Sequence, residues 1–366
     1  MATPAELDAM RRAIAIAADA VGRSNPNPAV GAVVLDAAGA VVGEGATAPI
    51  GGPHAEVEAL SAAGDRARDG TLVVTLEPCR HLGRTGPCTD AILAVGIRRV
   101  VFAVSDPHDA AAGGAELLTA AGVEVESGVL VDDVRIDLDP WLIAVRRRRP
   151  FLTWKYAATL DGRTAAADGT SRWISGPEAR RDVHRLRSRV DAVLVGIGTV
   201  LADDTALTVR DWPTVRQPIR VVLDGKARTP LSAQILDSAA PTLIAVGTDA
   251  DAERVKALRD TGAEVVELPR SNGRLDLRAL MATLHERDAL QLLLEGGATV
   301  AGSFVRERLV DRVVGYHAAA LLGAGPPVLG DAGVTTLADA LRLVVDDVVR
   351  VGADVRITAT VDREKR

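Results

Sequence analysis

The chain has 366 residues, of which 48% are apolar and 25% charged, and its net charge is −6. This length predicts two domains of about 150–200 residues each. An acidic chain with 2% aromatic residues lacks the basic face or stacking rings of a nucleic-acid binder, so we expect a small-molecule partner and no nucleic acid. No apolar run approaches the ~20 residues that span a bilayer, and the first ten residues lack a basic start. We therefore expect no membrane partner and a cytoplasmic location.

The first part of the chain alternates between helical and extended patterns. Apolar residues at helical spacing predict helices at residues 4–21, 54–63, 88–95 and 114–121. Short apolar runs bounded by turn residues predict strands at residues 29–35, 40–45, 71–76, 98–104 and 123–126. Such alternation predicts an α/β domain with a largely parallel sheet covered by helices.

One histidine and two cysteines are placed at the ends of these predicted elements. His54 begins a helix, Cys79 follows a buried strand, and Cys88 begins the next helix. A zinc ion held by three protein ligands keeps one position open for water. Glu56, two residues after the histidine, can then carry protons beside that water. A histidine-x-glutamate before a proline–cysteine pair is described for zinc-dependent deaminases, so we predict a catalytic zinc centre.

Two other interpretations of the cysteines remain open. A disulfide between Cys79 and Cys88 would suit a secreted protein. A purely structural zinc would need a fourth protein ligand, which only a more distant histidine could supply. The cysteines are separated by eight residues rather than two, and this gap contains Arg80, His81 and Arg84, which suit an anion.

The second part also alternates. Strands are predicted at 151–157, 192–195, 219–223, 242–246, 264–268 and 291–294, a helix at 177–189, and antiparallel edge strands at 312–316 and 355–361. Residues 146–150, four arginines and a proline, predict a helix end and linker, with phosphate binding as the alternative.

Two glycine turns each follow a predicted strand. They contain Gly196 and Gly198 in one case, and Gly296 and Gly297 in the other. A glycine turn between strand and helix lets backbone N–H groups meet phosphate, although neither turn matches a dinucleotide fingerprint and tight-turn geometry is the alternative. The residues alone thus indicate a zinc deaminase joined to a domain that can bind a nucleotide, and leave the second reaction open.

Short motifs along nearly the whole chain extend this interpretation. They occupy residues 27–33, 53–57, 75–81, 83–85, 87–88, 155–162, 171–174, 198–204 and 295–297. On these motifs the sequence resembles the bifunctional riboflavin-biosynthesis deaminase–reductase family. The resemblance implies a cytidine-deaminase-like α/β/α domain at residues 1–147 and a dihydrofolate-reductase-like α/β domain at residues 148–366. It also implies Zn²⁺ and NADPH as cofactors and a homo-oligomer, either dimer or tetramer.

The family's two reactions are successive. The first domain would hydrolyse an amino group from 2,5-diamino-6-ribosylamino-4(3H)-pyrimidinone 5′-phosphate, and the second would use NADPH to reduce the ribosyl group to ribityl. The alternative is an enzyme in which only the reductase works and the zinc domain is a scaffold.

The resemblance also assigns residues. For the deaminase it implies zinc on His54, Cys79 and Cys88, proton transfer by Glu56, and substrate contacts from Asn27, His81 and Arg84. For the reductase it implies sugar-phosphate contacts from Ser171, Arg187, Leu207 and Arg210, with Glu295 near the reacting ribose. NADPH contacts are expected from Ala158, Trp173, Thr199, Asp203, Gly297, Ala298, Thr299, Val300, Ala301, Gly302 and Ser303.

Several of these positions have alternatives. Trp173 can instead be a buried anchor, Arg187 a charge on a helix surface, and Lys155 a structural lysine at a strand. The sequence departs from the family at Thr47, where a histidine is usual, and at His108-Asp109, where asparagine-proline is usual. Both departures concern deaminase substrate contacts.

Overall fold

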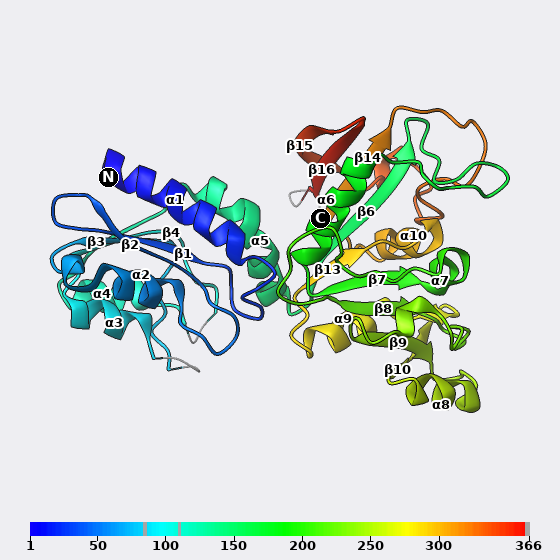
Figure 1. Ribbon diagram of the computed structural model, residues 1–366, viewed down its shortest axis with the longest axis horizontal. Coiled ribbons are helices and arrows are strands. Elements are labelled where there is room, and N and C mark those ends of the chain that lie inside the picture. Colours follow the sequence, from blue (N-terminus) through cyan, green and yellow to red (C-terminus); the bar gives the residue numbers. More distant parts are fainter. Residues whose placement is uncertain (83–85, 109–110, 363–366) are drawn as a thin grey trace. The chain divides into compact units, whose positions relative to one another are not determined.

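The computed structural model describes residues 1–82, 86–108 and 111–362, and the chain divides into two compact units, Met1–Arg148 and Arg149–Arg366 (Figure 1). Each unit has a sheet covered by helices, and each is described by itself.

The first unit contains a five-stranded sheet in the order β2-β1-β3-β4-β5. Its strands are β1 (Gly31–Leu35), β2 (Val41–Ala46), β3 (Thr71–Leu76), β4 (Arg99–Val104) and β5 (Glu124–Ser127). β3, β4 and β5 are parallel, whereas β1 is antiparallel to both β2 and β3. The prediction of a largely parallel sheet is therefore wrong at β1 and β2. The reason is the short turn after Leu35, because a short turn can join only antiparallel neighbours.

Helices cover both faces of this sheet (Figure 1). α1 (Pro4–Ala20) and α5 (Val131–Arg147) lie on one face, and α2 (Ala55–Ala63), α3 (Cys88–Val95) and α4 (Gly114–Ala120) on the other. α1 begins with a capping box, in which Thr3 and Glu6 exchange side-chain and backbone hydrogen bonds. Its contact with β1 is close, since a Cβ on Gly31 would lie 2.0 Å from the Ala13 carbonyl oxygen.

The arginine-rich segment after α5 is the predicted helix end. Arg148 is the C-terminal cap of α5. Arg149 forms a bidentate ion pair, at 2.7 and 2.8 Å, with Asp311, which like Arg149 belongs to the second unit. Arg149 is thus engaged within the protein.

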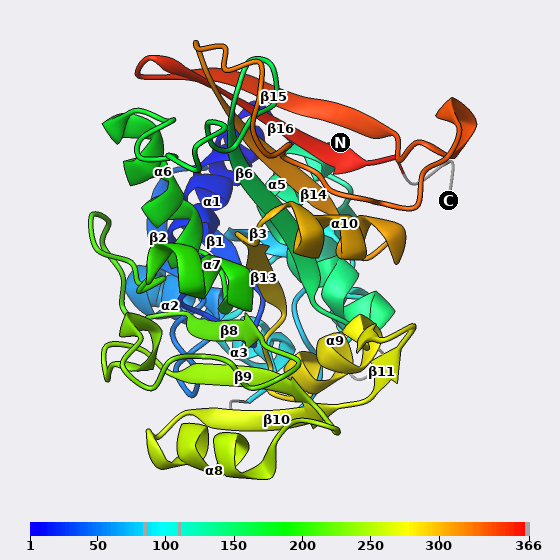
Figure 2. The ribbon, with the colours of Figure 1, turned by 90° about the vertical axis from the view of Figure 1, so that its right-hand side faces the viewer.

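The second unit contains a nine-stranded sheet in the order β10-β9-β8-β7-β13-β6-β14-β16-β15 (Figure 2). Its strands are β6 (Phe151–Thr159), β7 (Ala192–Gly196), β8 (Ile219–Leu223), β9 (Thr242–Gly247), β10 (Glu264–Leu268), β13 (Gln291–Leu294), β14 (Arg312–Ala318), β15 (Leu343–Val351) and β16 (Asp354–Val361). The strands predicted at 312–316 and 355–361 are antiparallel to each other, as β14 and β16, but neither is an edge strand as predicted, because β14 also pairs with β6 and β16 also pairs with β15. The edge strand on this side of the sheet is β15, which the sequence analysis missed because Asp346 and Asp347 interrupt its valines.

Helices pack on both faces of this sheet. They are α6 (Pro177–Ser188), α7 (Ile197–Asp203), α8 (Ala252–Asp260), α9 (Leu277–His285) and α10 (Ala298–Arg306), and a small hairpin is formed by β11 (Arg270–Ser271) and β12 (Arg274–Leu275). Alternation along β13 shows the two faces: Leu292 and Leu294 pack in the cluster with α9 and α10, whereas Leu293 packs in the cluster with α7 and α8. Burial on both faces explains the continuous apolar run.

The parallel strands β7, β13 and β6 are neighbours, so the loops that follow them meet at one edge of the sheet. In open α/β sheets, ligands bind at this carboxyl edge. Among the helices that the structure describes, none has both the length and the apolar character needed to cross a bilayer.

Candidate active sites

The predicted zinc ligands come together in the first unit. His54 is the N-terminal cap residue of α2 and makes no capping bond with its side chain, which leaves the ring free. Cys79 lies in the loop after β3, and Cys88 is the first residue of α3. The His54 Nδ1 atom lies 3.6 Å from the Cys79 Sγ and 3.3 Å from the Cys88 Sγ. All three ligand atoms lie within 4.8 Å of one another.

These separations fit a zinc ion. With Zn–S near 2.3 Å and Zn–N near 2.0 Å, tetrahedral angles place nitrogen and sulfur roughly 3.5 Å apart. Both cysteines are free and buried, so the disulfide interpretation is wrong for this structure. Over residues 1–82, 86–108 and 111–362, no fourth side chain joins the group, which leaves the structural-zinc alternative without its ligand. Three ligands leave room for water.

The charge state of Cys79 suits a cation. Hydrogen bonding with Cys88 lowers the pKa of Cys79 to about 4, and the same contact raises the pKa of Cys88, so the pair shares one proton. The hydrogen bond with Cys79 raises the pKa of His54. A ready thiolate is what a metal ligand requires.

Glu56 lies in the first turn of α2, beside this group, and is 4% exposed. Burial raises the pKa of its carboxyl to about 7. The carboxyl is close enough to the ligands that Cys79, His54 and Cys88 all affect it. The structure therefore places the predicted proton carrier at the predicted zinc ligands.

Glu77 supports the site in a way that the sequence analysis did not identify. Its buried carboxylate accepts hydrogen bonds from the backbone N–H groups of Asp106, Gly113 and Ala115, at 3.1–3.2 Å. It thereby ties the loop after β4 to the loop that carries Cys79. Gly114 allows the approach, since a Cβ there would lie 1.9 Å from the Pro78 carbonyl oxygen. The glutamate before the proline–cysteine pair was the available signal.

The predicted substrate contacts of the deaminase have different outcomes. Asn27 is half-buried in the loop before β1, and because β1 runs antiparallel to β3, that loop reaches the end of β3 that leads to Cys79. The Nδ1 atom of His81 is buried and has no hydrogen-bond partner among the described residues. Arg84 lies outside the described residues.

The two departures from the family pattern also differ. Thr47 is buried, and its hydroxyl accepts a hydrogen bond from the Val30 N–H at 3.1 Å, so it joins the end of β2 to the start of β1. His108 accepts backbone hydrogen bonds from Ala111 and Ala112 through its carbonyl oxygen. Asp109 is outside the described residues.

In the second unit, Glu295 is the centre of a charged cluster. Arg187 of α6 donates to its carboxylate twice, at 2.6 Å from Nε and 3.1 Å from Nη2. Lys155 of β6 places its Nζ atom 3.4 Å away. Burial alone would raise the pKa of Glu295, but Arg187 and then Lys155 outweigh it and lower the pKa to about 2. Glu295 is thus ionised at any working pH.

This cluster decides the interpretation of Arg187 and gives Lys155 a partner. Arg187 is buried and also donates from Nη1 to the Thr208 carbonyl oxygen, so it is not a charge on a helix surface. Lys155 has a specific partner in Glu295. The neighbouring Leu207 is buried with a φ of +50°, a left-handed conformation that is uncommon for leucine.

The remaining predicted reductase residues lie on several loops. Trp173 is 68% exposed, so the alternative of a buried anchor is wrong, and the Arg180 guanidinium lies 4.5 Å from its ring centroid. Ser171 is half-buried, Arg210 is exposed, and Arg172 donates to the Asp203 carbonyl oxygen at the end of α7. Ser171 and Trp173 lie in the segment between β6 and α6, and Arg210 lies in the segment between α7 and β8.

The two glycine turns lie side by side at the ends of β7 and β13. A Cβ on Gly196 would lie 2.6 Å from Val300, and the Glu295 N–H donates to the Leu194 carbonyl oxygen at 2.9 Å. Gly297 caps α10, and a Cβ on it would meet nothing within 4 Å. An open backbone turn at the start of α10 fits the pyrophosphate of a dinucleotide.

Not every residue predicted to contact NADPH faces open space. Gly297, Thr299 and Ser303 are exposed or half-buried, as are Thr199, Asp203, Ala298 and Val300. Ala301 is fully buried in the core, and a Cβ on Gly302 would lie 2.6 Å from the Asp331 carbonyl oxygen. Ala158 is fully buried in β6. Sequence spacing could not separate the open side of α10 from its packed side.

Comparison with known proteins identifies both units. Residues 150–357 match the RibD C-terminal domain, and residues 4–104 match the cytidine and deoxycytidylate deaminase zinc-binding region. The riboflavin biosynthesis protein RibD of Mycobacterium tuberculosis (strain ATCC 25618 / H37Rv) is 43% identical over 355 residues, which cover 96% of each chain. The chain belongs to the RibD family.

Further RibD proteins agree with this assignment. RibD of Aquifex aeolicus (strain VF5) is 41% identical over 95% of this chain and 96% of its own. The structure of Acinetobacter baumannii RibD, form 1, has a TM-score of 0.88 at 36% identity and covers 98% of this chain and 99% of that one. A structure from Thermotoga maritima, named as a diaminohydroxyphosphoribosylaminopyrimidine deaminase/5-amino-6-(5-phosphoribosylamino)uracil reductase, has a TM-score of 0.86 at 34% identity, covering 98% and 99%.

As a RibD family member, the chain is a bifunctional deaminase and reductase of riboflavin biosynthesis. Its deaminase unit binds zinc, and a RibD reductase domain implies NADPH. The predicted deaminase-like and reductase-like α/β folds are confirmed. The alternative in which the zinc domain is a scaffold has no support in these matches.

Proposed function

We propose that the first unit hydrolyses an amino group from 2,5-diamino-6-ribosylamino-4(3H)-pyrimidinone 5′-phosphate and that the second reduces the ribosyl group of the product to ribityl with NADPH. The observation that carries this proposal is that one chain has two sites. The first is the His54, Cys79 and Cys88 group beside Glu56, and the second is an ionised Glu295 cluster near the open glycine turn at Gly297. The substrates are those named for the Thermotoga maritima relative.

In the proposed deamination, zinc on His54, Cys79 and Cys88 supplies an activated water at neutral pH. Glu56 would carry one proton of the water to the ring nitrogen as the oxygen adds to the ring carbon, and then the second proton to the amino group, which leaves as ammonia when its bond to the ring carbon breaks. The ring thereby exchanges its amino group for oxygen. Asn27 and His81 bind the polar substrate, and Arg84, three residues after His81 in the sequence, pairs with its phosphate.

In the proposed reduction, Glu295 meets the ribose, and Arg187 and Lys155 hold its carboxylate in place and ionised. A carboxylate accepts hydrogen bonds from sugar hydroxyls, so a fixed Glu295 orients the sugar. Ser171, Leu207 and Arg210 bind the sugar phosphate. The backbone turn that begins α10, with Thr199, Asp203 and Trp173, binds NADPH.

The proposed domain assignment is deaminase at residues 1–147 and reductase at residues 148–366. It is supported by the C-terminal cap of α5 at Arg148 and by family matches on either side of that residue. We also propose a cytoplasmic location, which is supported by two free cysteines placed as metal ligands.

The chain is further proposed to form a homo-oligomer through β15. This edge strand exposes four apolar side chains by 41–61%: Leu343, Val344, Val345 and Val348. A long apolar edge strand is a template for pairing with another strand, and a second copy offers the same edge. Val345→Asp should reduce the mass measured by light scattering. Val215→Asp, at an equally exposed valine in the loop before β8, is the matched control and should not.

Mass spectrometry of the products tests the two reactions. Without NADPH, the diaminopyrimidinone substrate should lose one amino group and gain one oxygen. With NADPH, the product should also gain two hydrogens. Addition of hydrogens with the amino group retained would favour the enzyme in which only the reductase works.

A further inference from the structure

Residues 207–211, in the segment between α7 and β8, are held in place by side chains of other parts of the second unit. The Gln217 side chain accepts a hydrogen bond from the Val209 N–H at 2.7 Å and donates one to the Val209 carbonyl oxygen at 2.9 Å. Arg187 of α6 donates to the Thr208 carbonyl oxygen at 3.0 Å. These bonds take the place of a sheet ladder for a segment that lies outside the strands.

His184 of α6 supplies the next of these bonds. Its Nδ1 atom accepts a hydrogen bond from the Arg210 backbone N–H at 3.3 Å. Because a backbone amide nitrogen only donates, Nδ1 carries no proton, and the proton of the neutral ring is on Nε2, which lies 3.6 Å from the Asp211 carboxylate. The His184 side chain is buried, so water does not readily replace it as the acceptor.

The bond from His184 lies at the point where the chain leaves the core. Residues 207–209 are buried, whereas Arg210 is exposed. The Arg210 Nη1 atom donates to the Thr208 hydroxyl at 3.1 Å, which directs the guanidinium. Among the described residues no carboxylate pairs with Arg210, so its remaining donors are available to an anion. The backbone bond to His184 and the side-chain bond to Thr208 together define where those donors point.

The charged groups around the His184 ring keep it neutral. They come from three elements, and they are Arg187 on its own helix, Arg210 and Asp211 on the segment, and Glu295 at the end of β13. Burial and then the two arginines lower the pKa of His184 from 6.5, against the opposing effect of the two carboxylates. Protonation of the ring would turn Nδ1 into a donor that faces the Arg210 N–H, and the bond would be lost.

We propose that His184 is a positioning residue of the reductase, whose neutral imidazole holds Arg210 where that arginine meets the phosphate of the sugar substrate. The inference rests on the proposed contact between Arg210 and the sugar phosphate. His184 acts on the substrate only through the backbone of Arg210. Loss of its acceptor atom should therefore raise the KM for the sugar phosphate and leave the KM for NADPH unchanged.

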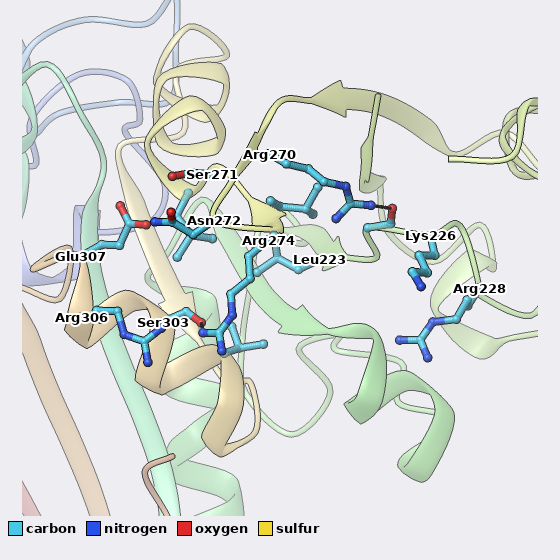
Figure 3. A pocket seen from close by; sticks show the side chains of 14 residues that line it. Leu223, Lys226, Arg228, Arg270, Ser271, Asn272, Arg274, Ser303, Arg306 and Glu307 are labelled. Carbon is cyan, nitrogen blue, oxygen red and sulfur yellow. Dashed lines mark hydrogen bonds between the residues drawn. The ribbon is translucent and has the colours of Figure 1, made fainter. Parts of the chain in front are cut away.

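A second cationic region of the same unit is separate from this segment. Lys226, Arg228 and Arg274 surround a pocket between the loop after β8 and α10 (Figure 3). Neither His184 nor Arg210 is among the residues that line it. A change at His184 leaves those cations in place, so a rise in the KM for the sugar phosphate alone points to the segment that carries Arg210.

Steady-state kinetics of the full chain, with the deaminated sugar phosphate and NADPH at neutral pH, test the proposal. His184→Leu keeps the bulk and removes the acceptor, so the KM for the sugar phosphate should rise about tenfold while kcat and the KM for NADPH change less than about twofold. His184→Asn offers an amide oxygen in place of Nδ1 and should bring the KM for the sugar phosphate to within about threefold of wild type. His285→Leu, at the end of α9, is the matched control and should leave both KM values unchanged.

The pH dependence of the same KM gives a second readout. The phosphate of the substrate gains a proton near about pH 6, so the KM of every variant should rise in acid. In the wild type the His184 ring is protonated as well, at a pH below 6.5, whereas asparagine does not titrate. The ratio of the wild-type KM to the His184→Asn KM should therefore rise as the pH falls from about 8 to about 5.

The contrary results are distinct from one another. A wild-type KM for the sugar phosphate in His184→Leu, or a ratio that does not change with pH, would overturn the inference. Equal increases in both KM values, with a lower unfolding temperature, would make His184 a packing residue and also overturn it. If His184→Leu does not fold, the pH dependence of the ratio decides alone. Failure of the wild type to reduce the deaminated sugar phosphate would instead contradict the proposed function.

Discussion

The two sites of this chain are assembled in different ways. The three deaminase ligands all lie between His54 and Cys88. Each ligand stands at one end of a helix or strand, and these elements are consecutive or nearly so in the chain. In the reductase, Lys155 and Glu295 are 140 positions apart and meet because β6 and β13 are neighbours in the sheet. A metal site can therefore be encoded in one short stretch, whereas a charged cluster of this kind depends on strand order.

The largest expected effect is on the metal. Cys88→Ser replaces a buried ligand by a residue of nearly the same size, so the fold should persist while zinc falls from about one per chain to near zero. Deamination should be lost, and reduction of the already deaminated intermediate should continue. Metal analysis and both assays measure this. Full zinc with full deamination would rule out the ligand set.

A smaller but still large effect is expected from Glu56→Gln. The change keeps size and polarity and removes the proton carrier, so zinc should remain bound while deamination falls by ~10²–10⁴-fold. Glu58→Gln, two residues further along α2, is the matched control and should be nearly silent. Reduction should be unaffected in both variants. If Glu56→Gln abolishes reduction, the two sites are not independent and the proposed domain assignment fails.

These contrasts match what could be predicted from the sequence. The zinc ligands and Glu56 were predictable because ligand type and spacing are local. The Arg187–Glu295 pair was not, since nothing in either segment states that α6 reaches the end of β13. The structural role of Glu77 was missed for the same reason, because its partners are backbone groups that only the fold brings together. The edge strand β15 was missed because Asp346 and Asp347 interrupt its valines.

Breaking the charged cluster tests the long-range site. Glu295→Gln leaves Arg187 and Lys155 without their anion, and we expect a loss of about 3 kcal/mol in the free energy of unfolding at neutral pH, together with loss of reduction. Because the pKa of Glu295 is lowered from 4.5 to about 2, its contribution is complete above about pH 4.5 and is lost as the pH falls through 2.

Thermal unfolding of the second unit from pH 7 to pH 2 measures this. The difference in the free energy of unfolding between wild type and Glu295→Gln should stay constant down to about pH 5 and then fall toward zero. Glu264→Gln, which breaks the exposed pair with Arg287, should cost less than about 1 kcal/mol. A difference in the free energy of unfolding that does not change with pH would mean that packing, and not charge, accounts for the lost stability.

The smallest effect is expected at Trp173, where a change in cofactor binding should occur without a change in stability. A side chain that is 68% exposed contributes little to packing, so Trp173→Ala should change the free energy of unfolding by less than about 0.5 kcal/mol. The Arg180 guanidinium nevertheless lies 4.5 Å from the centroid of its ring, and the preceding residue, Arg172, donates a hydrogen bond to the Asp203 carbonyl oxygen. Loss of one aromatic contact should raise the KM for NADPH about three- to tenfold and leave deamination unchanged.

Trp212→Ala, at another tryptophan beside an arginine, is the matched control and should leave the KM for NADPH unchanged. An unchanged KM in Trp173→Ala as well would make Trp173 a surface residue, and the cofactor contacts of the reductase would then be confined to the turns after β7 and β13.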